Sequence, residues 1–128
     1  MKKLLFIATL FVSIAAFAQT KAPLEFASTK YSFGKIKQGT PVTTEFKFTN
    51  NGDKPAIIET ATAECGCTTP DYPKTPIMKG KTGVIKVTYN AAAMGAFTKH
   101  VNVKVANTPE PIVLTIDGEV VTTAKTGK

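Results

Sequence analysis

Three features of the sequence predict an all-β protein. Apolar and polar residues alternate over several short segments, which is the pattern of half-buried strands. Gly, Pro and Asn separate these segments, and about seven of them follow one another at roughly 8–12-residue spacing. The 128-residue composition, with 43% hydrophobic and 20% charged residues and a mean hydropathy of +0.03, is globular and fits one domain. Together these features predict an immunoglobulin-like antiparallel β-sandwich of about seven strands over residues 24–121.

The segments can be placed in order along the chain. Strands are expected at 24–26, 30–33, 42–49, 57–63, 85–89, 97–105 and 112–120. Turns are expected at Gly34, at 39–41 and at 50–53, where Gly, Pro and Asn supply turn chemistry. Residues 66–83 hold three prolines, so this stretch is expected to be loop and edge strand.

The apolar phase of these strands predicts the core. Residues of that phase are expected to face inward, among them Phe46, Phe48, Val87, Val103 and Leu114. An antibody-type core is not expected, because that pattern needs two cysteines far apart in sequence and a Trp packed against them. This chain has no Trp, and its two cysteines are two positions apart.

The N-terminal segment has the three regions of a secretory signal peptide. Lys2 and Lys3 form the basic region, residues 4–17 the apolar region, and Ala16-Phe17-Ala18 the cleavage site. Residues 1–18 are therefore expected to be removed, which leaves 14 lysines against nine acidic residues and a net charge of +5. We expect an exported protein, periplasmic or extracellular, with a short linker at 19–23 and a flexible polar tail at 122–128.

The charge pattern disfavours several kinds of partner. All 16 basic residues are Lys, and nucleic-acid readers usually rely on the guanidinium fork of Arg, so no nucleic-acid partner is expected. The lysines are spread along the chain, which favours a solvating surface over a lipid- or heparin-binding patch. We expect no membrane span in the mature chain and no cofactor; a protein or another component of the cell envelope is the expected partner.

The motifs of the chain resemble those of a bacterial family, the domain of unknown function 1573. The matching residues run through the whole domain: Phe46-x-Phe48-x-Asn50-x-Gly52-x-x-Pro55, Cys65-Gly66-Cys67-Thr68, Gly80-x-x-Gly83, Gly95-x-Phe97-x-Lys99 and Leu114-x-Ile116-x-Gly118-x-Val120. The family commonly has Ser before the first cysteine and Pro before the glycine at position 80; Glu64 and Lys79 stand there in this chain. The resemblance implies an immunoglobulin-like domain, similar to those of the major sperm protein and hydin type, which serve mainly in binding and scaffolding.

Cys65 and Cys67 are the candidate disulfide or thiol site, with Gly66 and Thr68 as supporting residues. In an extended strand their Cα atoms would lie about 6.6–6.8 Å apart, at the limit for a disulfide, so a kink at Gly66 is expected to bring them closer. A disulfide closing a three-residue loop contributes only about 1.6 kcal/mol through chain entropy. Four interpretations stay open: a local disulfide or simple structural cysteines, a redox site, a metal site, and an intermolecular bridge.

Other chemistry finds little support in the sequence. Candidate additional metal ligands are His100, Glu64, Asp71, Met78 and Met94, but no spacing links them to the cysteines. His100 is expected on the outward face of its strand, exposed to solvent. The serine-hydrolase elbow, the zinc-protease motif and the phosphate-binding loop do not occur in the sequence. We therefore expect a non-catalytic binding or scaffolding module, with a redox or copper-handling module acting through Cys65 and Cys67 as the alternative.

Overall fold

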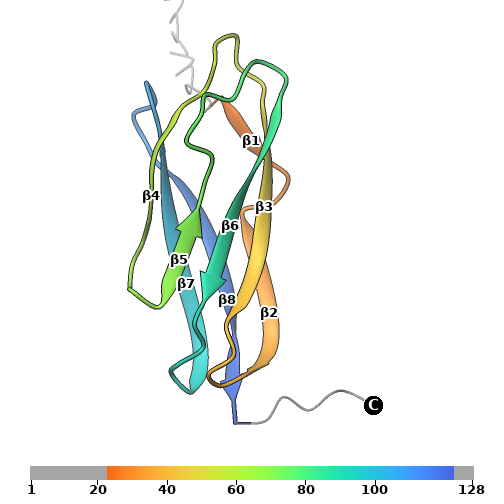
Figure 1. The fold of residues 1–128 in the computed structure, drawn as a ribbon, viewed down its shortest axis with the longest axis vertical. Helices are drawn as coiled ribbons and strands as arrows, with labels where there is room; N and C mark the ends of the chain where they lie inside the picture. The colour runs from red at the N-terminus through yellow and green to blue at the C-terminus, as the bar shows by residue number, and fades with distance from the viewer. Residues whose placement is uncertain (1–22, 123–128) are drawn as a thin grey trace, which may run out of the picture.

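The structure is a computed structural model, and it describes residues 23–122. The expected signal peptide, nearly all of the linker and most of the tail lie outside these residues. Within them the chain forms eight strands (Figure 1). In order they are β1 (Leu24–Phe26), β2 (Lys30–Lys37), β3 (Val42–Asn50), β4 (Ile58–Ala63), β5 (Thr68–Asp71), β6 (Thr82–Tyr89), β7 (Gly95–Val105) and β8 (Ile112–Val121).

The strands form two four-stranded sheets packed face to face, which confirms the predicted immunoglobulin-like sandwich. One sheet has the order β1-β3-β6-β5, and the other has the order β2-β8-β7-β4. Eight strands are present instead of about seven, because the edge strand expected within residues 66–83 forms as β5 in addition to the seven segments counted from the alternation. The first two strands lie in different sheets: β1 pairs with β3, and β2 crosses over to pair with β8. That crossing makes the β2–β8 pair parallel, so the prediction of a wholly antiparallel sandwich is wrong at this edge.

Gly34 does not form the predicted turn. The strand continues through it to Lys37, and Gly34 adopts a φ of +70° in a bulge where the β2–β8 register shifts between Ser32 and Lys35. Gly118 on β8 faces this bulge, and a Cβ there would lie 2.8 Å from the Gly34 carbonyl oxygen. A bulge absorbs one extra residue without ending a strand. A glycine suits a bulge as well as a turn, so the sequence alone does not tell which of the two forms.

The predicted alternation is confirmed along the central strands. Phe46, Phe48, Val87, Val103 and Leu114 are all buried, as expected from their phase. Strand β4 departs from a simple alternation, because its register against β7 shifts between Ile58 and Thr60. As a result, Ile58 faces the core before the shift, and Ala61 and Ala63 pack against the core after it.

A buried amide holds the end of the sandwich where β3 stops. Asn50 is completely buried, and its Nδ2 donates hydrogen bonds to the carbonyl oxygens of Lys54 and Ile77 at 2.9 and 2.8 Å. Its Oδ1 accepts a hydrogen bond from the Gly52 backbone N–H at 2.9 Å. Because every polar atom of the side chain is used, the buried amide ties the β3–β4 and β5–β6 connections together without leaving an unsatisfied group.

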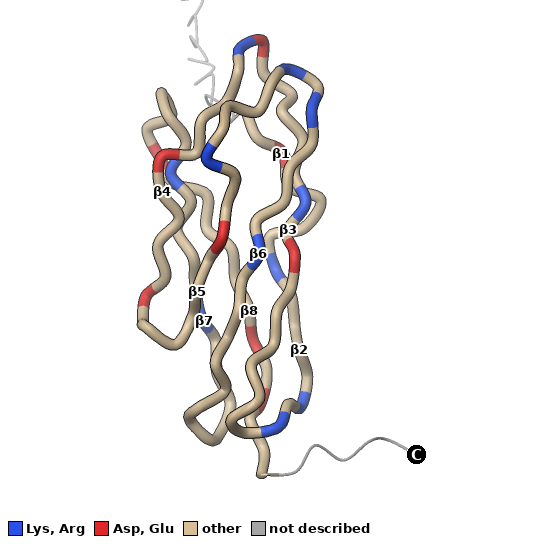
Figure 2. Tube along the Cα trace, viewed as in Figure 1, with Lys and Arg blue, Asp and Glu red and all other residues tan. Residues whose placement is uncertain are grey.

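Charged side chains are interspersed over the surface of the sandwich. Figure 2 shows lysines and acidic residues scattered along strands and turns of both sheets, with neither sign confined to one face. This distribution agrees with the expected solvating surface. Between residues 23 and 122 no helix is long and apolar enough to cross a membrane.

Candidate functional site

The Cys-Gly-Cys motif forms the turn between β4 and β5, not part of an extended strand. The Thr68 N–H donates to the carbonyl oxygen of Cys65 at 3.4 Å, which closes a four-residue turn. Cys65 and Cys67 are joined by a disulfide, with their Cα atoms 5.3 Å apart. The turn thus brings the two Cα atoms well inside the range of about 4.4–6.8 Å that a disulfide needs.

Gly66 is not held in this turn by its special backbone freedom. Among the described glycines, a positive φ occurs at Gly34, Gly39, Gly80 and Gly95, and not at Gly66. A Cβ added at Gly66 would meet no atom within 4 Å. The expected kink is therefore present, but it is a hydrogen-bonded turn that does not use a positive φ at Gly66.

The turn carries the chain from one sheet to the other and is anchored on both. On the β6 side, the Asn90 N–H donates to the carbonyl oxygen of Cys67 at 2.9 Å, and Thr68 pairs with Tyr89 in the β5–β6 ladder. On the β7 side, Glu64 bonds to His100 through both its backbone and its side chain. Backbone hydrogen bonds to two different sheets therefore fix both ends of the disulfide turn.

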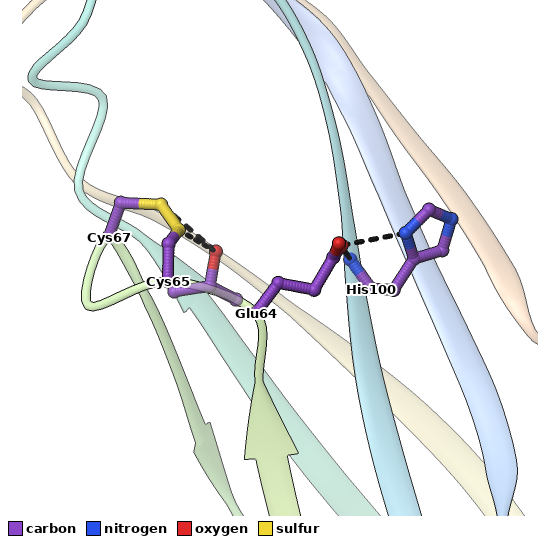
Figure 3. A network of polar contacts seen from close by, with 5 residues as sticks. Glu64, Cys65, Cys67 and His100 are labelled. Atoms are coloured by element: carbon purple, nitrogen blue, oxygen red, sulfur yellow. Dashed lines mark hydrogen bonds and ion pairs between the residues drawn. A yellow bond between two sulfur atoms is a disulfide. The ribbon is translucent and has the colours of Figure 1, made fainter.

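The two sulfur atoms share one hydroxyl neighbour. Thr68 is only 4% exposed, and its Oγ1 lies 3.7 Å from Cys67 Sγ and 3.9 Å from Cys65 Sγ, as the dashed lines in Figure 3 mark. Both cysteines are half-buried, and of the two only Cys67 is among the described residues that pack against the core. The disulfide is thus half-buried, with Cys67 on the core side, and lies next to a buried hydroxyl.

Glu64 and His100 form a pair beside the turn. Glu64 Oε1 accepts hydrogen bonds from the His100 backbone N–H at 2.6 Å and lies 2.7 Å from His100 Nδ1. The backbone hydrogen bond from His100, followed by the side-chain hydrogen bond, lowers the pKa of Glu64 below its ordinary value of 4.5. In Figure 3 the carboxylate points toward His100 and away from the disulfide, so this contact keeps a negative charge off the sulfur atoms.

The structure brings only some of the sequence-predicted candidates together. Glu64 and His100 meet, and Glu64 directly precedes Cys65 in the chain. Asp71 lies on β5 opposite Lys86, while Met78 and Met94 are exposed in two separate connections. In the described part of the chain no three of its His, Cys, Asp and Glu side chains are grouped so that they could hold a metal ion.

Three connections at one end of the sandwich are linked by hydrogen bonds. The Gly39 N–H donates to the carbonyl oxygen of Ala91 at 2.9 Å, and Gln38 Nε2 donates to that of Ala92 at 3.0 Å. Asn90 continues the chain of contacts to Cys67. We call this surface the disulfide end; it consists of residues 38–41, 65–67 and 90–94, and lies in the lower part of Figure 1. Ala91 within it is fully buried and has a φ of 56°, a conformation that L residues other than Asn and Asp rarely adopt.

Two contacts of this site were not predicted from the sequence. His100 was expected to be merely solvated, but it is paired with a residue 36 positions away in sequence. Thr68 was singled out only as part of the motif, although its hydroxyl contacts both sulfur atoms. The one available signal in the sequence was the position of Thr68 at the start of an edge strand, directly after Cys67. If its side chain faces inward there, its hydroxyl lies next to the cysteines.

Comparison with known proteins locates the chain in a family. A family model described as "Protein of unknown function (DUF1573)" matches residues 24–120, almost the whole described domain. No curated protein matches the chain in sequence.

Solved structures share the fold at low sequence identity. A protein of unknown function from Porphyromonas gingivalis W83 matches with a TM-score of 0.66 and 15% identity over 75% of this chain. The chain spans 46% of that protein, about half its length. The ASH/PapD-like domain 7 of human CEP192 matches with a TM-score of 0.70 and 11% identity, covering 89% of this chain and 98% of that domain. The secreted serine protease VesC from Vibrio cholerae matches at 0.61 and 13%, covering 78% of this chain and 23% of the protease. At these identities the likeness concerns the fold alone.

Proposed function

We propose that this chain, which belongs to the DUF1573 family of proteins of unknown function, is an exported, non-catalytic binding or scaffolding module of the cell envelope. The expected signal peptide of residues 1–18 supports the export part of this proposal. Intact-mass measurement of the protein from its native cells tests it, since the mature chain should begin at Gln19. A chain that keeps Met1 and stays in the membrane fraction would contradict export.

The disulfide end is the observation that carries the binding proposal. Its three connections each run from one sheet to the other. Three hydrogen bonds link them, and the disulfide closes the connection at residues 65–67. Binding loops are effective when a rigid scaffold fixes them, because less conformational entropy is lost when a partner docks. The disulfide end meets this requirement, since its loops are held before any partner arrives.

Met94 supplies an apolar contact on this surface. It is 51% exposed in the β6–β7 connection, next to the segment that bonds to the disulfide turn. Methionine side chains are flexible and polarisable, so they adapt to partner surfaces of different shape. We assign Met94 as an anchor for a protein partner.

A matched pair of substitutions tests the binding surface. Met94→Lys alters the disulfide end, whereas Met78→Lys places the same charge on a methionine of similar exposure, 55%, in the β5–β6 connection near the opposite end. Each variant is immobilised and exposed to a native cell-envelope extract, and captured proteins are compared with those of the unchanged domain. A partner lost with Met94→Lys and kept with Met78→Lys supports the proposal. Equal loss or equal retention would contradict the assignment of this end.

A second candidate function is a thiol-based one at Cys65 and Cys67. It is favoured by the half-buried position of the disulfide and by the Thr68 hydroxyl beside both sulfur atoms. A disulfide in so short a loop adds little stability, so it is free to serve in thiol–disulfide exchange. Its reduced form would offer two thiolates, which suit copper(I). Thiol counts with and without reductant, followed by a copper(I) titration of the reduced protein, separate the redox and copper versions.

A further inference from the structure

The two sulfur atoms of the disulfide have different surroundings, so they are not equivalent targets for an attacking thiolate. Cys67 packs against the hydrophobic core, and among the described residues in contact with that core Cys65 does not occur. Thr68 Oγ1 lies 3.7 Å from Cys67 Sγ and 3.9 Å from Cys65 Sγ, so its hydroxyl is within reach of a thiolate on Cys67. Cys67 is therefore the sulfur atom on the core side and Cys65 the one on the side away from it, and a charge that develops on Cys67 lies next to a hydroxyl donor.

We infer that this disulfide oxidises dithiol partners, and that the partner thiolate attacks Cys65 rather than Cys67. Cys67 is then the leaving thiolate, and Thr68 is its hydrogen-bond donor. The inference rests on the proposed thiol–disulfide exchange function. Its substrate class is a protein dithiol of the exported compartment. A leaving thiolate of lower pKa departs faster, and a hydroxyl that donates to the thiolate lowers its pKa.

The exchange proceeds in two balanced steps. A thiolate of the dithiol forms an S–S bond with Cys65 Sγ, the Cys65–Cys67 bond breaks, and its electron pair leaves on Cys67. The second thiol of the partner, once deprotonated, attacks the partner sulfur of the mixed disulfide and releases Cys65 as a thiolate. The partner loses two electrons and two protons and becomes a disulfide, while Cys65 and Cys67 gain them as two thiols.

Glu64 adds a positioning role to this arrangement. The incoming thiolate is an anion, and a carboxylate beside Cys65 would repel it. Two contacts to His100, at 2.6 and 2.7 Å, hold the Glu64 carboxylate on the β7 side of the turn, pointing away from the sulfur atoms in Figure 3. The Glu64 carboxylate is thereby kept away from the approach to Cys65.

The direction of attack can be measured on the whole mature chain. The oxidised protein is mixed briefly with glutathione, quenched in acid, alkylated and mapped by tandem mass spectrometry. We expect the glutathione adduct mainly on Cys65 and the alkyl group mainly on Cys67. Adducts distributed equally, or mainly on Cys67, would overturn the assignment.

The role of Thr68 is tested by changing its hydroxyl at nearly constant shape. With dithiothreitol as the reductant, Thr68→Val should slow reduction about three- to tenfold, the change expected for the loss of one hydrogen bond. Thiolate absorbance at 240 nm should show a raised pKa for Cys67 in reduced Thr68→Val, and Thr68→Ser should restore both quantities. Thr69→Val, at the exposed neighbouring position of β5, serves as the matched control and should change neither.

Different results would refute the exchange function and the role of Thr68. If dithiothreitol does not reduce the unchanged protein while it reduces an ordinary small disulfide, the exchange function itself is wrong. If the unchanged protein is reduced but Thr68→Val matches it in both rate and thiolate pKa, the exchange function stands and the inference about Thr68 is wrong.

Discussion

Removing the Phe48 ring should cost more stability than any other single truncation considered for this domain. The side chain is 2% exposed, its ring centroid lies 5.3 Å from that of Phe26, and it lies over Gly83 on the neighbouring strand β6. Phe48→Ala leaves a cavity in a close-packed interior, which costs about 3–5 kcal/mol. The whole domain is expected to be stable by only about 5–15 kcal/mol, so this loss is a large part of the total.

Urea denaturation followed by circular dichroism measures the effect. With a slope of about 1.5 kcal/mol per molar urea, a loss of 3–5 kcal/mol lowers the midpoint by about 2–3 M. Thr49→Ala is the matched control, because Thr49 is the next residue of β3 and points to the opposite, half-exposed side. It should cost under about 1 kcal/mol. Equal losses for the two variants would refute the assigned register of β3.

A substitution at Gly83 gives a second test of the position of the Phe48 ring. A Cβ added there would overlap the Phe48 ring, so Gly83→Ala should cost about 1–3 kcal/mol through overpacking. In the Phe48→Ala background the ring is gone and the new methyl group enters the cavity. The double variant should therefore be more stable than the sum of the two single losses predicts, by about 1 kcal/mol or more. Strict additivity would show that the ring does not lie against Gly83.

Three further predictions concern the disulfide turn. Cys65→Ser/Cys67→Ser should fold and lose about 2 kcal/mol or less in urea denaturation, because a three-residue loop gains little from closure; failure to fold would make the cysteines structural and remove the support for exchange. Gly66→Ala should change stability by no more than about 0.5 kcal/mol, since the position has open space and no positive φ, and a larger loss would show strain in the turn. Glu64→Gln should lower the thermal midpoint near neutral pH, and the difference should vanish in acid. The lowered pKa of Glu64 means that the stability given by its contact with His100 is present above pH 4.5 and lost as the pH falls through the folded-state value; a difference independent of pH would contradict this origin.

The alternation of apolar residues was sufficient to predict the core of most strands. Ile85, Val87 and Tyr89 are all at most 2% exposed, as their period of two requires. The prediction was less complete where the backbone departs from a regular strand. Gly34 and the register shift at Ile58 are bulges, and a bulge depends on how two strands fit together, which the sequence of one strand does not contain.

By itself, the sequence determined the fold class and the face that each central strand buries, because both follow from local spacing along the chain. It left the state of Cys65 and Cys67 open, and the structure shows them joined in a short turn. Only the tertiary structure decided which strands pair, so the crossing of β2 to lie parallel to β8 could not be predicted. The same holds for the site: Glu64 meets His100 across 36 residues of sequence, and the Thr68 hydroxyl reaches both sulfur atoms only because the turn folds back over it. The Glu64–His100 contact depends on the pairing of β4 with β7, and local periodicity carries no information about which residues of different strands lie side by side. The contacts of Thr68 depend on the conformation of the turn, which the alternation pattern does not describe either.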